Sequence, residues 1–181
     1  MTRKNKGKES KKDDSKRNTL ILVCGLPGTG KSTVSKAIAE RTKALLFNTD
    51  VVRKELFSRP AYTQEEKDLV YKMLFEMAEK FLKQSKNIVL DGTFYKEELR
   101  SRVKEIAQRN RSAFAIVEVV CSEKTAKRRL DERAKSESLS DADFCVYRKI
   151  REQFEPIREK HFVVDTGKNV GRQIAGFLKN F

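Results

Sequence analysis

The 181-residue sequence predicts an α/β fold in which helices cover both faces of a five-stranded parallel sheet. Short apolar runs rich in β-branched residues alternate along the chain with longer stretches of helical periodicity. Gly25, Asp50, Asp91 and Asp165 each fall at the carboxyl end of one of these runs. Because parallel sheets bind ligands beyond the carboxyl ends of their strands, we expect the functional site at this edge.

The elements follow from local pattern and length. A capping box at Thr63–Glu66 opens a long amphipathic helix that continues through Leu82, and Pro156 stops a later helix. We expect one globular domain over residues 19–181, with a short helical lid at about 123–155. The expected strands are 19–24, 44–47, 87–90, 113–121 and 162–165, and the other expected helices are 31–42, 51–57, 96–110, 123–135, 141–154 and 170–178.

A glycine-rich stretch joins the first strand to the first helix. Residues 25–32 fit the pattern G-x-x-x-x-G-K-[ST], which a random chain of this length matches with odds of roughly 0.5–1%. The alternative is an ordinary strand-to-helix turn, but the order strand, loop and helix is the one that a phosphate cradle needs. We therefore expect ATP here, with Lys31 on the β- and γ-phosphates and Ser32 on Mg²⁺. The expected nucleotide-binding residues are Gly25, Pro27, Gly28, Thr29, Gly30, Lys31, Ser32 and Thr33.

Carboxylates follow the second and third strands. Asp50 is placed to accept the proton of an attacking hydroxyl, with Arg53 one helical turn later, although Asp50 could instead cap the helix at 51–57. Asp91 is placed to act as a partner of Mg²⁺ or as an acceptor-binding carboxylate. The alternative for Asp91-Gly92 is an everyday turn, which is weakened because a helix follows.

The lid helix supplies several arginines. Arg128, Arg129 and Arg133 precede a polar loop, and one or two of them could close over the triphosphate and stabilise charge on the transferred group. A solvated basic face is the alternative for each. Arg129 and Arg133 are the favoured pair.

Charge is the strongest global signal. Residues 1–18 carry +5 of the net charge of +14. We expect this hydrophilic tail to be disordered. It is either a basic arm that binds RNA or DNA or a solvated leader. The remaining +9 favours polyanionic partners.

The remaining composition limits the compartment and the chemistry. Three cysteines without C-x-x-C spacing indicate small buried thiols in a reducing, cytoplasmic compartment, and we expect no secretory signal or membrane span. His161, the single histidine, is assigned a packing or capping role. The oligomeric state is left open, with a monomer favoured.

Two motifs that are absent from the sequence argue against other classes of P-loop protein. The chain has no Asn-Lys-x-Asp motif, which argues against a GTPase switch. The third strand ends in Leu-Asp-Gly without the Asp-Glu pair of mechanical ATPases.

These motifs resemble the small P-loop kinases often labelled "predicted kinase", with polynucleotide 5′-hydroxyl kinases and gluconate-kinase-like enzymes as relatives. The resemblance runs over about residues 19–166 and rests on the glycine-rich stretch, Asp50-Val-Val-Arg53, Val-Leu-Asp91-Gly-Thr93 and residues 153–156. It implies a nucleoside-kinase-like, three-layer P-loop fold. One departure is Gly92, where relatives often have Ala or Thr. The resemblance implies Asp50 as base, Arg53 on the acceptor's phosphate, Arg129 or Arg133 on the donor, Thr166 near the adenine, and Asp91, Thr93 and Arg100 on the acceptor.

The sequence thus predicts an ATP- and Mg²⁺-dependent kinase. The leading acceptor is the 5′-hydroxyl of RNA or DNA, since the domain keeps +9 without its tail and offers Arg53 for a phosphate. Two alternatives stay open: a small-molecule kinase of the gluconate or antibiotic type, and a nucleotide-dependent nucleic-acid-binding module with little turnover.

Overall fold

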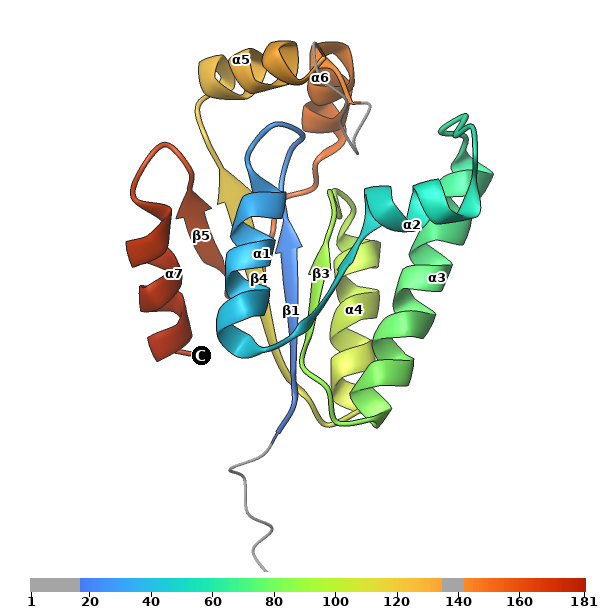
Figure 1. Cartoon of the computed structure of the whole chain (residues 1–181), viewed down its shortest axis with the longest axis vertical. Helices are drawn as coiled ribbons and strands as arrows, with labels where there is room; N and C mark the ends of the chain where they lie inside the picture. The colour runs from blue at the N-terminus through green and yellow to red at the C-terminus, as the bar shows by residue number, and fades with distance from the viewer. Residues whose placement is uncertain (1–16, 135–141) are drawn as a thin grey trace, which may run out of the picture.

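A computed structural model describes residues 17–134 and 142–181 and confirms the predicted three-layer α/β architecture (Figure 1). Within these residues, five parallel strands form one sheet in the order β2-β3-β1-β4-β5. Strand β1 is central and pairs with β3 on one side and β4 on the other. The strands are β1 (Thr19–Cys24), β2 (Leu45–Asn48), β3 (Ile88–Asp91), β4 (Ala113–Val120) and β5 (Phe162–Asp165).

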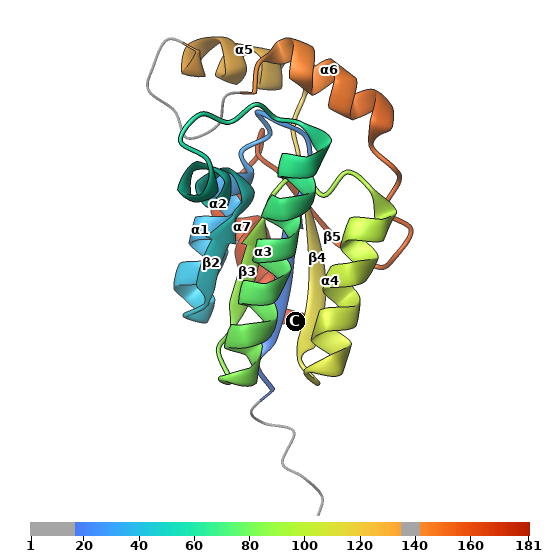
Figure 2. The same ribbon diagram turned by 90° about the vertical axis from the view of Figure 1, so that its right-hand side faces the viewer.

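Helices cover both faces of the sheet. Helices α1 and α7 pack on one face and α3 and α4 on the other, while α5 and α6 lie beyond the carboxyl ends of the strands (Figures 1 and 2). Their bounds are α1 (Lys31–Thr42), α2 (Thr49–Leu56), α3 (Gln64–Lys83), α4 (Glu97–Arg109), α5 (Glu123–Arg133), α6 (Phe144–Gln153) and α7 (Val170–Lys179).

The central strand is apolar throughout because both of its faces are covered. Leu20 and Leu22 pack with α3 and α4, whereas Ile21 and Val23 pack with α1 and α7, and all four are fully buried. This two-sided burial fixes β1 in the middle of the sheet. The loop that follows β1 is thereby anchored at the centre of the carboxyl edge.

Helix boundaries differ slightly from the prediction. The helix expected at 141–154 begins at Phe144, because Asp143 accepts a hydrogen bond from the Val146 N–H and is the N-cap. Helix α5 ends at Arg133 with Ala134 as its C-cap, one residue before the described part stops, and residue 135 of the predicted 123–135 helix lies outside the described residues.

Most of the tail predicted at 1–18 lies outside the described residues, but its end belongs to the fold. The Asn18 side chain donates to Leu82 O at 2.8 Å and accepts from Ser112 Oγ at 3.0 Å. The prediction of disorder is therefore wrong for Asn18, because its amide links the segments that precede β3 and β4.

The three cysteines and the histidine have different surroundings. All three thiols are free; burial raises the pKa of Cys24 to about 12, but Cys145 is exposed, contrary to the expectation of buried thiols. His161 hydrogen-bonds Glu159 O at 2.8 Å and lies 3.3 Å from a Glu118 carboxylate oxygen, ahead of β5.

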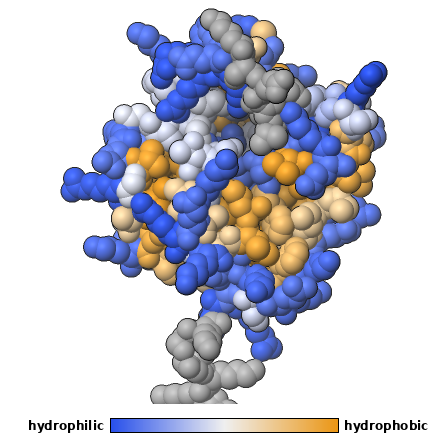
Figure 3. Space-filling model, in the orientation of Figure 1, coloured by the Kyte–Doolittle hydropathy of each residue, from blue (hydrophilic) through white to orange (hydrophobic). Residues whose placement is uncertain are grey.

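Hydrophilic side chains surround the face seen in Figure 3, with apolar surface gathered in its middle. Edge strand β2 and helix α2 expose Leu45, Val51 and Leu56, each by just over a third. None of the helices in the described part of the chain combines the length and apolarity that crossing a bilayer requires.

Two strand leucines test the burial pattern. We expect Leu22→Ala, in the fully buried centre, to lower the free energy of unfolding by about 2–5 kcal/mol. Leu45→Ala, at the 37% exposed edge, should cost under about 1 kcal/mol. Urea unfolding of both variants measures the difference; equal losses would contradict the two-sided burial of β1.

Candidate active site

The glycine-rich loop, residues 25–30, turns sharply between β1 and α1. Gly25 and Gly28 have φ values of +141° and +76°, which other residues rarely adopt. A Cβ at Gly25 would lie 2.3 Å from Val119 O, so only glycine fits there. Thr29 is buried, and its hydroxyl donates to Leu26 O at 2.8 Å, so it shapes the loop and does not face the cavity.

Lys31 begins α1 and folds back across the loop, where its Nζ donates to Leu26 O at 2.9 Å. Burial lowers the pKa of Lys31, and the carboxylates of Asp91 and Asp50 act in the opposite direction. Arg133 on the lid is close enough to lower the same pKa further. The ammonium group therefore lies where two carboxylates and a second cation converge.

A buried hydrogen-bond network joins three elements at Asp91, which is 1% exposed. Ser35 Oγ on α1 donates to Asp91 Oδ2 at 3.0 Å, and Asn48 Nδ2 at the end of β2 donates to the same oxygen at 2.6 Å. Asp91 Oδ1 is buried without a hydrogen-bond partner among the described residues. A buried carboxylate oxygen with no donor leaves capacity for a bound water or cation.

The donor set fits Mg²⁺ in the way that nucleotide-bound magnesium is usually held. Ser32 lines the cavity with an exposed side chain, and Asp91 supplies the free carboxylate oxygen. No group of three or more His, Cys, Asp or Glu side chains suited to a metal occurs in residues 17–134 and 142–181. Mg²⁺ keeps several waters and takes few protein ligands, so one hydroxyl and one carboxylate oxygen are a sufficient set of protein donors for it.

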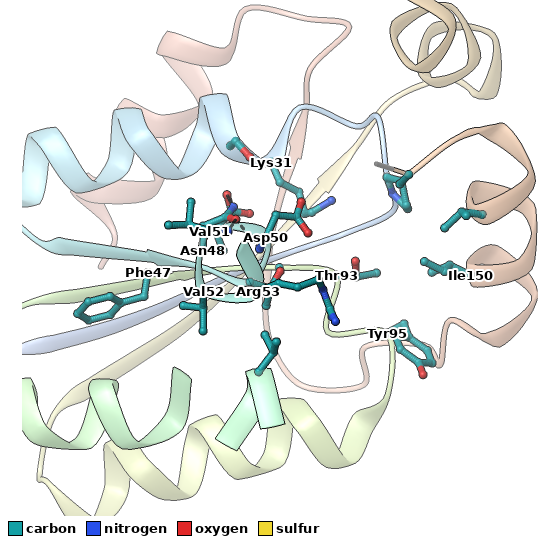
Figure 4. A pocket seen from close by; sticks show the side chains of 18 of the residues that line it. Lys31, Phe47, Asn48, Asp50, Val51, Val52, Arg53, Thr93, Tyr95 and Ile150 are labelled. Carbon is teal, nitrogen blue, oxygen red and sulfur yellow. Dashed lines mark hydrogen bonds between the residues drawn. The ribbon is translucent and has the colours of Figure 1, made fainter. Parts of the chain in front are cut away.

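Helix α2 places Asp50 and Arg53 on one side of the cavity (Figure 4). The helix begins at Thr49, and its cap is Asn48, whose side chain accepts from Asp50 N at 2.7 Å and from Val51 N at 3.1 Å. The alternative that Asp50 caps this helix is therefore wrong. Its carboxylate lies on the side toward Lys31 in Figure 4.

Arg53 is 7% exposed and extends from α2 toward Thr93 and Tyr95 (Figure 4). Its Nη1 lies 3.4 Å from a Glu66 carboxylate oxygen, and its guanidinium lies 4.8 Å from the centre of the Tyr62 ring. Arg53 Nε is buried without a partner in the described part of the chain. The side chain is thus fixed in direction while keeping one unused donor.

The three arginines of α5 differ in position. Arg129 Nη1 donates to Thr166 Oγ1 at 2.8 Å and to Thr29 O at 3.2 Å, and the Thr166 hydroxyl itself donates to Thr29 O at 2.6 Å. Arg129 and Thr166 thus brace the glycine-rich loop, and only Arg129 also lines the cavity. Arg133 lines the cavity as well and donates to Ala142 O at 3.2 Å, whereas exposed Arg128 pairs with Glu132.

Of the two remaining residues predicted to bind the acceptor, one lines the cavity and the other does not. Thr93 lines the cavity, but Arg100 is fully buried and does not. Its guanidinium donates to the carbonyls of Phe94, Glu155 and Pro156. The prediction that Arg100 binds the acceptor is not supported, because its guanidinium is buried away from the cavity and its Nη1 and Nη2 atoms bind backbone carbonyls.

Several cavity residues were missed by the sequence analysis. Helix α6 presents one face to the cavity, at the spacing i, i+3, i+4, i+7, which a helical-face reading of that segment could have found. Three tyrosines from separate segments also line the cavity. Burial raises the pKa of one of them, Tyr71, so its hydroxyl stays protonated. These residues are Val146, Lys149, Ile150, Gln153, Tyr62, Tyr71 and Tyr95.

The resulting cavity has a volume of about 1000 Å³ and an excess of positive charge. Its seven cationic side chains outnumber its three carboxylates, which suits an anionic ligand. The cations are Lys31, Lys36, Arg53, Lys67, Arg129, Arg133 and Lys149, and the carboxylates are Asp50, Glu55 and Asp91.

The strand order and the glycine-rich loop before α1 define a P-loop protein of the kinase-like type. A family model described as an AAA domain matches residues 20–157, so the chain belongs to this AAA-type P-loop kinase family. Uncharacterized proteins of Mycobacterium tuberculosis and Mycobacterium bovis are 32% identical over 115 residues. The matched part covers 57% of this chain and only 23% of each relative's length.

Solved structures show the same fold. A candidate kinase from Chloroflexus aurantiacus has a TM-score of 0.73 at 17% identity, over 92% of this chain and 97% of that one. The Mycobacterium tuberculosis APS kinase, solved with AMPPNP and APS, has a TM-score of 0.69 at 12% identity, over 90% and 96%. A Sinorhizobium meliloti gluconokinase has a TM-score of 0.65 at 20% identity, over 91% and 95%.

Two glycines test the loop geometry. Gly28→Ala should lower the free energy of unfolding by about 1–3 kcal/mol, because the residue has a left-handed φ and a Cβ would lie 2.9 Å from Ala126 O and Leu130 Cγ. Gly176→Ala, in α7 with nothing within 4 Å, should instead raise it by up to about 1 kcal/mol. Chemical denaturation of both variants gives the signs; stabilisation by Gly28→Ala would refute the strained loop.

Proposed function

We propose that the chain is an ATP- and Mg²⁺-dependent kinase that transfers the γ-phosphoryl group of ATP to a hydroxyl. One observation supports this most strongly: the loop lysine Lys31, the carboxylate of Asp50 and the guanidinium of Arg53 line a single cationic cavity. Such an arrangement offers a phosphate cradle, a proton acceptor and an anion-binding group within one enclosure.

On the donor side, the backbone N–H groups of the loop and Lys31 would hold the β- and γ-phosphates. Ser32 and the free oxygen of Asp91 would hold Mg²⁺ directly or through water, and the metal would neutralise charge on the phosphates. Arg133 would stabilise negative charge on the transferred group. Arg129 and Thr166 would flank the base end of the nucleotide.

On the acceptor side, Asp50 would accept the proton of the attacking hydroxyl. The bond between the acceptor oxygen and the γ-phosphorus forms while the bond from that phosphorus to the β,γ-bridging oxygen breaks, which releases ADP. Arg53, with its unused Nε donor, would bind an anionic group of the acceptor. Positioning and charge neutralisation then supply the catalysis.

The leading acceptor is the 5′-hydroxyl of RNA or DNA. Arg53, Lys67 and Lys149 place cations from three different helices around the acceptor half of the cavity, as successive phosphates require. A small-molecule kinase is the second candidate, because α6 closes over the cavity and the gluconokinase shares this fold. A nucleotide-dependent binding module is the third.

The direct test is transfer of labelled γ-phosphate from ATP to a short 5′-hydroxyl oligonucleotide. We expect Asp50→Asn to lower turnover at least about a hundredfold with ATP binding retained, because the amide cannot accept the proton. The matched control is Asp68→Asn, an exposed change on α3 at a residue that accepts a hydrogen bond from the Gln64 side chain.

The outcomes separate the three candidates. Labelling that depends on Asp50 supports a polynucleotide kinase. No labelling with ATP still bound turns the search to small alcohols, and normal turnover in Asp50→Asn would sink the base assignment. Oligonucleotide binding that survives Asp50→Asn without any transfer supports the binding module.

Salt gives a second test of the acceptor. With about three phosphates contacted on a single strand, oligonucleotide affinity should fall on the order of tenfold between 50 and 200 mM salt. Arg53→Gln should reduce the salt slope by about one phosphate, whereas Arg59→Gln, an exposed change after α2, should leave it unchanged. Fluorescence anisotropy measures both; a flat salt response would rule out the nucleic-acid acceptor.

A further inference from the structure

Two segments far apart in the sequence meet at the guanidinium of Arg100, which is fully buried on α4. Its Nη1 donates to Phe94 O at 2.8 Å, and its Nη2 donates to Glu155 O at 2.9 Å and to Pro156 O at 3.1 Å. Phe94 lies in the loop after β3, and the other two residues follow the lid helix α6. The Arg100 side chain therefore hydrogen-bonds both segments.

The first segment, residues 92–96, carries part of the acceptor wall. Thr93 and Tyr95 line the cavity on either side of Phe94, whose own side chain is fully buried and packs edge-on to Tyr71 at 5.2 Å between ring centres. Phe94 has a φ of +44°, in the left-handed region that a bulky residue rarely adopts. Such a backbone persists only where its surroundings hold it, and Arg100 binds its carbonyl.

The second segment is the root of the lid. Helix α6 ends at Gln153, and two residues later the Glu155 N–H donates to Tyr95 O at 2.9 Å. The Glu155 carboxylate also accepts from the Glu97 N–H at the start of α4. The root of α6 is thus fixed to the loop of Thr93 and Tyr95, and α6 itself supplies Lys149 and Ile150 to the lining of the same cavity. Ile150 lies near Tyr95 in Figure 4.

Burying the guanidinium of Arg100 costs desolvation free energy that packing alone does not require. It forms no ion pair in residues 17–134 and 142–181, and its Nε is buried without a partner there. An apolar side chain of similar length would fill the space without the desolvation cost of a guanidinium. What an apolar residue would not supply is the set of bonds to two separate backbone segments.

We propose that Arg100 is a positioning residue that couples the acceptor loop at 92–96 to the root of lid helix α6. The loop and α6 then move as one body. This rests on the proposed function only in assigning this half of the cavity to the acceptor. Arg100 accordingly controls acceptor binding and lid order, while donor binding at the glycine-rich loop is independent of it.

The first test is hydrogen exchange, which needs no acceptor. Arg100→Met should increase exchange at least tenfold in both 92–99 and 144–158, with and without AMPPNP. Exchange in 19–42 and the AMPPNP dissociation constant should stay within twofold. Arg102→Met is the matched control, since Arg102 is two residues away on α4, exposed, and stacked over Phe75.

A second variant covers the case in which Arg100→Met does not fold. Glu155→Ala removes an exposed side chain that binds the Glu97 N–H at the same junction. We expect it to raise exchange in both segments at least threefold. A rise in only one of the two segments, or an even rise across the sheet with a lower Tm, would overturn the coupling in favour of a merely structural role.

Steady-state kinetics distinguish the proposed positioning role of Arg100 from a general loss of stability. With the 5′-hydroxyl oligonucleotide as acceptor, Arg100→Met should lower kcat/KM for the oligonucleotide at least tenfold while KM for ATP stays within twofold. Equal losses for donor and acceptor would overturn the proposal. If the unaltered protein transfers no phosphate to the oligonucleotide, the proposed acceptor is wrong, and the exchange experiment still decides the coupling.

Discussion

The buried carboxylate of Asp91 is the interaction on which the site depends. It accepts from Ser35 on the helix that carries the glycine-rich loop and from Asn48 at the start of the helix that carries Asp50. Asn48 uses its other amide atom to cap α2. The Asn48 amide therefore fixes the position of α2 relative to α1 and the glycine-rich loop, and the Asp91 carboxylate fixes the amide.

The placement of Asp91 also explains how a strongly basic cavity is tolerated. Lys31 is drawn into partial burial, which lowers its pKa, and the nearby carboxylates of Asp91 and Asp50 offset that effect. Arg53 is held by Glu66 and by the ring of Tyr62. Lys31 and Arg53 thus each have their own compensation, and the remaining excess positive charge of the cavity is available to an anionic ligand.

The sequence predicts the parts of this site that depend on local pattern. The glycine-rich stretch, its strand and its helix are contiguous, so the geometry at Gly25 and Gly28 follows from spacing alone. The position of Asp50 relative to Lys31 follows from the parallel order of the strands. The cap at Asn48 was missed because Asp50 lies two residues later and is an equally good capping residue by type. Only the observed start of α2 at Thr49 decides between them.

Arg53 and Arg100 show where sequence reasoning stops. Both are arginines on helices that follow the carboxyl edge, both are more than nine-tenths buried, and both leave Nε without a partner among the described residues. Arg53 lines a cavity, and its guanidinium contacts the Glu66 carboxylate and the Tyr62 ring. Arg100 faces none, because the chain returns after α6 and supplies carbonyls on its remaining sides. The difference between a ligand-binding cation and a structural one is therefore made by a segment more than fifty residues away, and no local pattern around either arginine contains it.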